Sequence, residues 1–327
     1  MTATSRPALI VLGLGLGVLL IFPALADRYY LQLVTKIMLV AIFAISLDLL
    51  VGYVGLVSLG HAAFFGLAGY ALALAQRHLD LVSLWTTLPL ALVVSAAAAA
   101  VIGWLSLRTS GIYFIMITLA FGQMLYYLFN DYVALGGSDG MFVNTKPTVS
   151  VAGYDLLNLR NRTAFFYFVL GWLALSYALL VMLLRAPFGR VIAGIRVNEP
   201  RTRALGYPVQ YYKLVAFVIA GTLAGLAGYL NAVQFGVVNP AILGWRESGL
   251  VLMMVILGGM GTLFGPVLGA FVIVLLETWL EGLTEHWLLV FGVFVVAVVL
   301  FLPNGLAGLL VRPRPAAEPA EEKNGDG

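Results

Sequence analysis

The sequence predicts an all-α polytopic membrane protein with about ten transmembrane helices. Of its 327 residues, 62% are hydrophobic and only 10% are charged, which is more apolar surface than one soluble core can bury. Apolar runs of about 18 or more residues recur along almost the whole length, and each can cross a hydrocarbon core of about 30 Å as a helix. Helices are favoured because lipid offers no hydrogen-bond partner to an unpaired backbone amide.

Hydropathy places the expected spans in order along the chain. They cover residues 8–26, 31–52, 55–75, 86–107, 111–130, 164–184, 212–235, 247–258, 262–280 and 287–303. The eighth and ninth are separated because Gly258, Gly259, Gly261 and Gly265, followed by Pro266, interrupt an otherwise continuous apolar run. We therefore expect broken helices near the centre of the bundle.

Basic residues set the expected orientation. The segment 185–213 carries five arginines and Lys213 against the single acidic residue Glu199, so the positive-inside rule places it in the cytoplasm. Arg312 and Arg314 place the C-terminal end on the same side, which requires an even number of crossings between the two segments. We expect a transmembrane domain over 1–310, an extracytoplasmic loop at 131–163, a cytoplasmic loop at 185–211 and a disordered cytoplasmic tail at 311–327.

The N-terminal segment has a second interpretation. Arg6, the apolar run 9–22 and the sequence Ala24-Leu25-Ala26 also match a cleavable signal peptide. Cleavage would leave nine spans and a mature chain that begins outside, with the basic loop still in the cytoplasm.

Composition and motifs exclude several function classes. The absence of cysteine removes disulfides and thiolate chemistry. A formal charge of +3, without an aromatic and basic patch, makes nucleic acid an unsuitable partner. The sequence contains no G-x-x-x-x-G-K-[ST] phosphate loop, so this chain does not bind and hydrolyse ATP by the usual machinery. We expect a transport subunit without cofactors or metals of its own.

Two stretches are rich in glycine and small polar residues, at 46–66 and 257–270. The first places Asp48, Ser58 and His61 at hydrocarbon depth, where an ionisable group needs a partner or a wet cavity. These side chains either hydrogen-bond helix backbones and each other or line a solute path. The second stretch repeats the small-residue character, and paired breaks of this kind favour two inverted repeats with a pathway between them.

The cytoplasmic loop is the third informative stretch. Residues 185–207 combine arginines with Asn198, Glu199 and a terminal Gly206 that suits a left-handed helix cap. A basic anchor at the inner leaflet is one explanation. The mixture of charges instead favours a short rigid helix that pushes on a partner.

Ordered motifs over about residues 40–310 resemble the permeases of branched-chain amino acid ABC importers, a family that includes permeases for urea and short amides. The motifs are Ser46-Leu47, Gly52-Tyr53-Val54-Gly55, 58–66, Gly111-Ile112-Tyr113-Phe114, 118–122, Pro187-Phe188-Gly189-Arg190, Ala204-Leu205-Gly206, 213–217, Gly258-Gly259-Met260-Gly261-Thr262 and Pro303-Asn304-Gly305-Leu306. Asp48 departs from the pattern, because the family usually has an uncharged amide there.

The resemblance implies that the cytoplasmic loop couples the chain to a separate ATPase. The coupling residues are Pro187, Gly189, Arg190, Arg196, Glu199, Arg201, Arg203 and Gly206. It also implies a second homologous permease subunit, two ATP-binding subunits that hold the ATP, an extracytoplasmic solute-binding protein and a place in the bacterial inner membrane.

Two further residue sets complete the prediction. We assign the translocation path to Asp48, Ser58, His61, Thr118, Gly259, Gly261 and Thr262. Arginines at outer turns can pair with carboxylates on the binding protein; these are Arg77, Arg160, Arg162 and Arg246. They also suit interfacial anchoring.

The expected function is import of branched-chain or other small neutral amino acids by alternating access. Urea, short amides and aromatic acids are alternative solutes. A stand-alone secondary transporter that uses Asp48 as an ion site is a rival, as is an intramembrane enzyme, for which Asp48 and His61 alone make a poor constellation.

Overall fold

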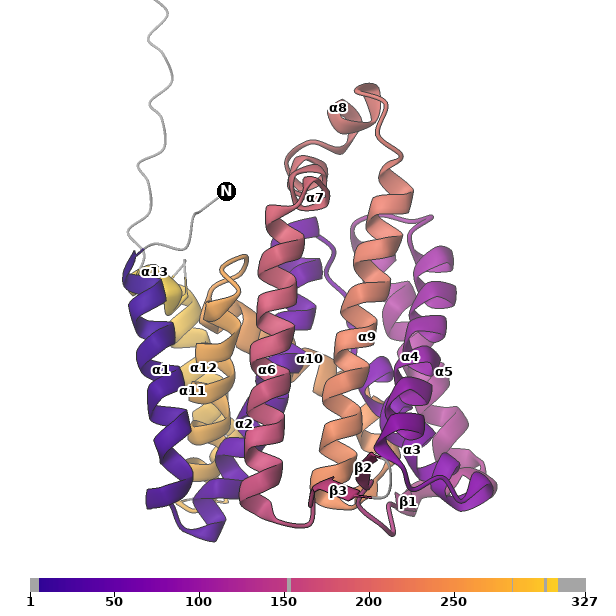
Figure 1. Cartoon of the computed structure of the whole chain (residues 1–327). Coiled ribbons are helices and arrows are strands. Elements are labelled where there is room, and N and C mark those ends of the chain that lie inside the picture. Colours follow the sequence, from indigo (N-terminus) through magenta and orange to yellow (C-terminus); the bar gives the residue numbers. More distant parts are fainter. Residues whose placement is uncertain (1–5, 152–153, 284, 303–304, 311–327) are drawn as a thin grey trace, which may run out of the picture.

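The computed structural model describes residues 6–151, 154–283, 285–302 and 305–310. The long apolar helices pack into a bundle (Figure 1). The expected mainly helical fold is therefore confirmed. The longer helices are α1 (Arg6–Leu25), α2 (Arg28–Asp48), α3 (Ala62–Leu79), α4 (Leu84–Ser106), α5 (Ile112–Asp131), α6 (Arg162–Arg185), α9 (Val209–Phe235), α10 (Trp245–Gly258), α11 (Phe264–Glu281) and α12 (Trp287–Phe301).

Short elements connect these helices. They are the π-helical turn η1 (Leu49–Val54), the 3-10 turns η2 (Val133–Leu135), η3 (Gly137–Asp139) and η4 (Pro240–Leu243), the strands β1 (Met141–Phe142), β2 (Val149–Val151), β3 (Tyr154–Leu157) and β4 (Val237–Val238), and the helices α7 (Pro187–Val197), α8 (Glu199–Ala204) and α13 (Ala307–Leu310). Two small antiparallel sheets, β1 with β4 and β2 with β3, are an addition to the expected all-helical fold.

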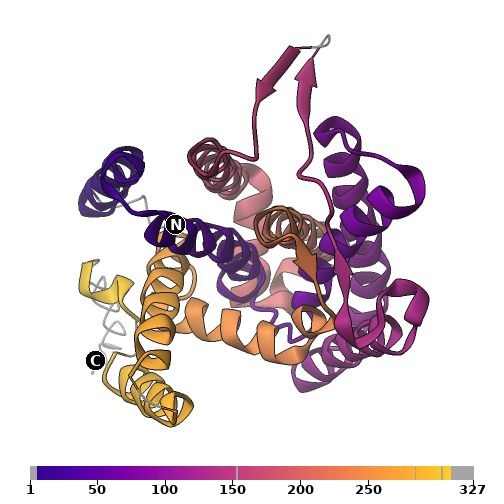
Figure 2. The same ribbon diagram turned by 90° about the horizontal axis from the view of Figure 1, so that it is seen from below.

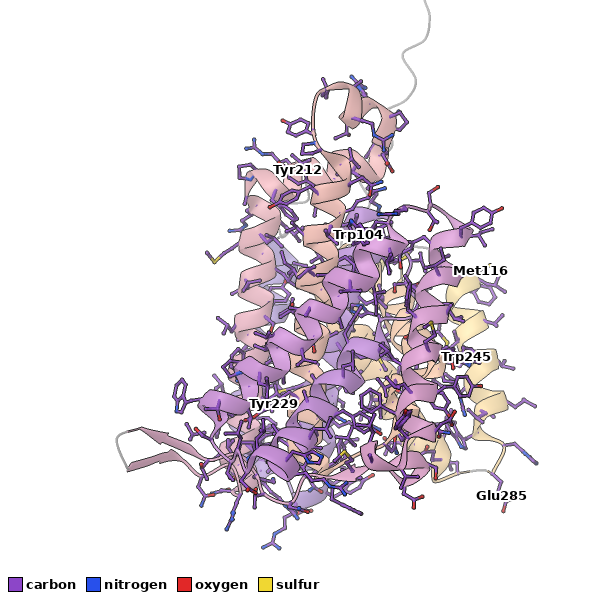
Figure 3. All side chains as sticks on the ribbon, turned by 90° about the vertical axis from the view of Figure 1, so that its right-hand side faces the viewer. Trp104, Met116, Tyr212, Tyr229, Trp245 and Glu285 are labelled. Atoms are coloured by element: carbon purple, nitrogen blue, oxygen red, sulfur yellow. The ribbon has the colours of Figure 1, made fainter. Side chains whose placement is uncertain are left out.

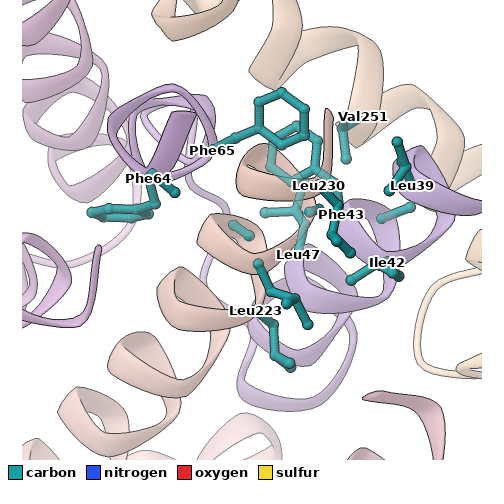
Figure 4. Close-up of a cluster of buried hydrophobic side chains, with 14 of the residues drawn as sticks. Leu39, Ile42, Phe43, Leu47, Phe64, Phe65, Leu223, Leu230 and Val251 are labelled. Carbon is teal, nitrogen blue, oxygen red and sulfur yellow. The ribbon is translucent and has the colours of Figure 1, made fainter. Parts of the chain in front are cut away.

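Helices α2, α3 and α9 form the centre of the bundle. Residues 41–48 of α2 are buried, and its side chains Ile42 and Leu47 belong to the same buried cluster as Phe64 of α3 and Leu223 of α9 (Figure 4). Glycines on α9 allow the close approach, because a Cβ on Gly228 would lie 1.8 Å from the carbonyl oxygen of Phe65. Tight small-residue contacts of this kind hold helices together where no hydrophobic driving force acts between them.

Each predicted span has a helix over most of its range. Six helical segments of the described chain are long and apolar enough to cross a membrane: Arg28–Val54, Leu84–Ser106, Ile112–Asp131, Arg162–Arg185, Val209–Phe235 and Phe264–Glu281. Gly15–Leu25 and Trp287–Val298 are shorter apolar helices. The number of crossings and the inverted repeats therefore stay predictions, as does cleavage near residue 26.

The expected third helix begins later than predicted. Residues 55–61 are not helical, and α3 starts at Ala62 and continues to Leu79. The reason is steric, because Gly55 takes a left-handed conformation with φ of 82° and ends the preceding turn. Gly60 then passes so near α5 that a Cβ there would lie 2.0 Å from the carbonyl oxygen of Thr118.

The expected break between the eighth and ninth helices is present. Residues 259–263 form an irregular segment between α10 and α11, with left-handed φ values of 112° at Gly259 and 77° at Gly261. In the view along the bundle, α10 runs across it rather than along its axis (Figure 2). Gly269 allows the two helices to pack, since a Cβ there would lie 2.0 Å from the carbonyl oxygen of Met254.

The two ends of the bundle differ. Helices α7 and α8 project beyond one end, and the short strands lie at the other (Figure 1). The hairpin of β2 and β3 extends sideways from the bundle (Figure 2). The predicted loop 131–163 is thus partly folded, whereas the predicted tail 311–327 lies outside the described residues.

Candidate functional site

The two glycine-rich stretches, 46–66 and 257–270, meet in the structure at Asp48. This residue ends α2 and is fully buried. Its Oδ1 accepts a hydrogen bond of 2.7 Å from the backbone N–H of Gly261, and its Oδ2 accepts one of 3.3 Å from the N–H of Leu263. The carboxylate therefore joins the end of α2 to the break between α10 and α11.

Two segments interrupt the α-helices: residues 49–61, which follow α2, and residues 259–263, between α10 and α11. We call these the two chain breaks, and their backbones also touch. A Cβ built on Gly52 would lie 2.2 Å from Asp48 Oδ1 and 2.4 Å from the backbone nitrogen of Gly261. A Cβ on Gly261 would lie 3.0 Å from the carbonyl oxygen of Gly52. Only glycine fits at Gly52, since contacts below 3 Å with backbone atoms cannot be relieved by turning a side chain.

The break itself holds backbone strain at Leu263. This residue has φ of 52° and ψ of −46°, and the N–H of Phe264 donates to the carbonyl oxygen of Thr262 at 2.6 Å. The pattern is a γ-turn of the rare, strained kind. Thr262 stabilises it locally, because its Oγ1 donates to Gly259 and accepts from the N–H of Gly265. Strain of this size persists only where the surroundings hold it, and it gathers at moving or functional segments.

A second buried polar group lies at the start of α3. His61 is fully buried, and its Nε2 lies 2.9 Å from the Oγ of Ser46 on α2. Its ring stacks on Phe43 with 5.6 Å between centroids. The hydroxyl of Ser248 on α10 accepts a 2.9 Å hydrogen bond from the N–H of Ala62, so it caps α3 from another helix.

Two other predicted path residues, Thr118 and Ser58, make no hydrogen bond to Asp48 or His61 among the described residues. Thr118 of α5 is buried, and its hydroxyl donates to Ile115 of its own helix. Ser58 is buried in the non-helical segment before α3. Within the described residues, neither the Oγ of Ser58 nor the Nδ1 of His61 has a hydrogen-bond partner. The structure thus groups Asp48 with Gly259, Gly261 and Thr262, and it groups His61 with Ser46.

Helices α7 and α8 form the projecting loop. The turn from α6 into α7 needs Gly189, because a Cβ there would lie 2.1 Å from the carbonyl oxygen of Leu184. Pro187 occupies the first turn of α7 and preorganises it. Asn198 caps α8 through a 2.9 Å hydrogen bond from the N–H of Arg201. Gly206 ends the loop with φ of 88°, so its expected left-handed conformation is confirmed.

Charged side chains of the loop divide into three groups. Arg190 and Arg201 are exposed. Glu199 bonds to Lys213 of α9 at 2.5 Å and to Arg203 at 2.7 Å, so its carboxylate fastens α8 to α9. Arg196 is exposed as well, but its Nη1 donates to the carbonyl oxygen of Gly52.

Apolar side chains flank the exposed arginines. Val197, Leu205 and Tyr211 are 87%, 71% and 64% exposed at the tip of the loop. An exposed patch that mixes arginine with large apolar side chains is typical of protein-protein contacts. In Figure 3 the loop lies beyond Tyr212, clear of the bundle.

Comparison with known proteins identifies the family. A family model described as branched-chain amino acid transport system / permease component matches residues 29–301. The chain belongs to this permease family.

Curated relatives agree with this assignment. The permease is 33% identical over 304 residues to the high-affinity branched-chain amino acid transport system permease protein LivM of Salmonella typhimurium. It is 32% identical over 304 residues to LivM of Escherichia coli, and both alignments cover 87% of the permease and 71% of the relative. It is also 35% identical over 116 residues to the autoinducer 2 import system permease protein LsrC of Klebsiella pneumoniae, covering 33% of the permease and 34% of the relative. No solved structure matches the chain.

Three of the four predicted docking arginines lie near the strand end of the permease. Arg77 is in the last turn of α3, and Arg160 and Arg162 lie where α6 begins; all three are exposed. Nearby, burial and the positive charge of Arg162 lower the pKa of Lys146 below its usual value. These residues place several basic side chains at this end of the bundle.

Arg246 lies elsewhere. It follows Trp245 at the start of α10, and Figure 3 places Trp245 well inside the height of the bundle, far from Glu285 at the rim. Arg246 and its neighbour Glu247 are nevertheless exposed on the isolated chain. Charged groups are costly against lipid, so we expect these two side chains to face water or a partner.

Sequence reasoning missed several residues that the structure brings into the site. Ser248 and Gly52 contact the predicted residues directly, and Gly305 packs on the break, where a Cβ would lie 2.6 Å from the nitrogen of Gly259. Gly52 and Gly305 both lie in motifs of the family resemblance. Ser248 follows two charged residues in an apolar region, which was an available signal.

The lining of an apolar cavity of about 340 Å³ includes none of the predicted site residues. It is lined by α1, α6 and α11, chiefly through Leu16, Leu19, Leu173, Tyr177, Phe264 and Leu268. In the described part of the permease, no group of three histidine or acidic side chains gathers that could hold a metal ion.

Proposed function

We propose that the chain is the transmembrane permease subunit of a binding-protein-dependent importer for branched-chain or other small neutral amino acids. A separate ATPase drives it, and two ATP-binding subunits, a second homologous permease and an extracytoplasmic binding protein complete the transporter in the bacterial inner membrane. The membership in the branched-chain amino acid permease family supports this proposal.

The projecting loop is the observation that carries the proposal. Helices α7 and α8 lie outside the bundle, present exposed arginines beside exposed apolar side chains, and reach the chain breaks through Arg196. A solvated anchor needs neither the apolar tip nor the ion pair from Glu199 to Lys213 that fastens α8. Both features fit a rigid element that docks on the ATPase from the cytoplasm and transmits its movement.

The open face of α5 and α10 supports the second permease subunit. Helix α5 exposes Tyr113, Met116, Met124 and Tyr127 along one side. The charged first turn of α10 is also exposed on the isolated chain. A second subunit that covers this face would shield Arg246 and Glu247 from lipid.

The paired breaks support alternating access. Irregular backbone at membrane depth is tolerated where it is buried in protein or lines a path. Here Asp48 holds the break between α10 and α11 against the end of α2. Movement of α7 would change this contact and so open and close a path that includes Ser58 and His61.

Uptake in reconstituted vesicles tests the proposal. The permease, its partner permease and the ATP-binding subunits are placed in proteoliposomes, with the binding protein and radiolabelled leucine outside and ATP inside. We expect uptake that requires both ATP and the binding protein, with leucine competed by isoleucine and valine. Uptake that follows a proton gradient without ATPase subunits would identify a secondary transporter instead. Competition by urea or an aromatic acid in place of valine would reassign the solute.

Docking is tested separately. Replacement of both Arg201 and Arg203 by glutamine should reduce co-purification of the ATP-binding subunits. Retention of the full complex and of its solute-stimulated ATP hydrolysis would contradict the coupling assignment.

A further inference from the structure

Arg196 occupies a different position from the other arginines of the loop. It lies in the last turn of α7, and its Nη1 donates to the carbonyl oxygen of Gly52 in η1. The same nitrogen would lie 3.3 Å from a Cβ on Gly261. Its Cγ would lie 3.3 Å from a Cβ on Gly55. One side chain from the cytoplasmic loop therefore contacts the backbone of both chain breaks.

The charge of Arg196 also acts on the buried carboxylate. Arg196 interacts electrostatically with Asp48, which in turn accepts the N–H groups of Gly261 and Leu263. A buried carboxylate is costly unless charge and hydrogen bonds compensate it. The guanidinium thus contributes to the stability of the contact between the two breaks.

The carbonyl of Gly52 is a suitable acceptor for such a link. The last carbonyls of a helix lack partners within it, and η1 ends at Gly55, whose left-handed conformation turns the chain away. A hydrogen bond from a charged donor contributes more than one from a neutral donor. Helix α7 is consequently fastened to the backbone near the end of η1.

We propose that Arg196 is a positioning residue that latches α7 onto both chain breaks, so that displacement of α7 releases the backbones at Gly52 and Gly261 together. The inference rests on the proposed function, in which the ATPase docks at α7 and α8. It deepens that function by dividing the coupling residues: Arg190 and Arg201 contact the ATPase, whereas Arg196, which bonds to Gly52, acts within the permease. The latch keeps the cytoplasmic side of the path closed at rest.

Cysteine accessibility tests the latch directly. The sequence contains no cysteine, so a Ser58→Cys reporter in the non-helical segment is the single thiol in the chain. Ser176→Cys on α6 is the matched reporter, because Ser176 is also buried and its hydroxyl also lacks a partner among the described residues. The probe is a membrane-permeable maleimide, applied to membranes that contain the assembled transporter without ATP.

The latch predicts a selective change in labelling. Arg196→Gln should raise the labelling rate at position 58 by at least about tenfold, which is the lower end of the effect of losing one hydrogen bond that involves a charged group. Labelling at position 176 should stay unchanged. Arg196→Lys should give an intermediate rate at position 58, because it keeps the charge and loses the fork geometry. Arg108→Gln, which removes an exposed arginine from the end of α4, should leave both rates as they are.

Two results would overturn the latch. One is a rate at position 58 that Arg196→Gln does not change. The other is an equal rise at positions 58 and 176, because that would mean that Arg196 only holds the fold together.

Transport assays separate this failure from failure of the proposed function. With Arg196→Gln, the ATP-binding subunits should still co-purify, and leucine uptake per ATP hydrolysed should fall by about tenfold. Loss of co-purification would place Arg196 at the ATPase contact and refute the latch. Failure of ATPase docking itself appears as loss of co-purification in the Arg201 and Arg203 variants, whereas failure of the latch appears in the labelling rate at position 58.

Discussion

Replacement of Gly52 by alanine tests the contact between the two chain breaks most directly. The added Cβ would lie 2.2 Å from Asp48 Oδ1 and 2.4 Å from the nitrogen of Gly261. Real Cβ contacts of this length do not occur, and the neighbours are backbone atoms and a fully buried side chain. The two breaks must therefore move apart, and the hydrogen bond from Gly261 to Asp48 must lengthen or break.

The magnitude follows from two effects. Overpacking of a tight site costs about 1–3 kcal/mol. Loss of a hydrogen bond to a charged acceptor costs about 1.5–3 kcal/mol. Together these give a destabilisation of about 2.5–6 kcal/mol, which is a large share of the 5–15 kcal/mol that typically separates folded from unfolded protein.

The assay is thermal unfolding of the purified protein in detergent, followed by tryptophan fluorescence, together with leucine uptake. Gly171→Ala is the matched control, since Gly171 lies within α6 and a Cβ there would meet nothing within 4 Å. The control should be neutral or more stable by up to about 1 kcal/mol, because alanine favours the helix. Equal unfolding midpoints and equal uptake for Gly52→Ala and Gly171→Ala would refute the close approach of the two breaks.

Substitutions at three further residues probe polar contacts. Ser248→Ala should destabilise the protein by about 1 kcal/mol, because the N–H of Ala62 loses its cap; the same midpoint as wild type in thermal unfolding would argue against the cap. His61→Ala should lower the stability of the protein by about 2–4 kcal/mol, because it leaves a cavity beside Phe43. His61→Gln should lower it less, because its amide can bond to Ser46. Equal losses of stability for the two variants would exclude that bond. Glu199→Gln should lower the protection of the α8 backbone in hydrogen exchange, because Lys213 loses its charged partner. Protection of α6 should stay unchanged. Unaltered protection of α8 would contradict the role of Glu199 in fastening α8 to α9.

Much of the fold was predictable because hydrophobicity is a property of local sequence. The loop at 185–211 was recognised from its arginines, and Gly206 from its position at the end of a charged helix. The break near Gly259 and Gly261 was recognised from the glycine cluster. Each of these signals lies within a few residues of the feature that it predicts.

The third helix shows where local signals fail. Residues 55–61 are as apolar as the helix that follows, so hydropathy alone predicted one continuous span. The chain is not helical there because Gly60 must pass within contact distance of the backbone of α5. That constraint comes from a helix about 60 positions away, and no local pattern reports it.

The sequence alone determined that the chain is a helical membrane protein with a basic loop in mid-sequence and glycine-rich breaks, because composition and spacing carry that information. Only the tertiary structure decided which of these features meet. Asp48 bonds to Gly261 across 213 positions, and Arg196 reaches Gly52 across 144. The physical reason is that a buried carboxylate and an unpaired carbonyl can be satisfied by any donor that folding brings within hydrogen-bond distance, and residue type does not specify which donor that is.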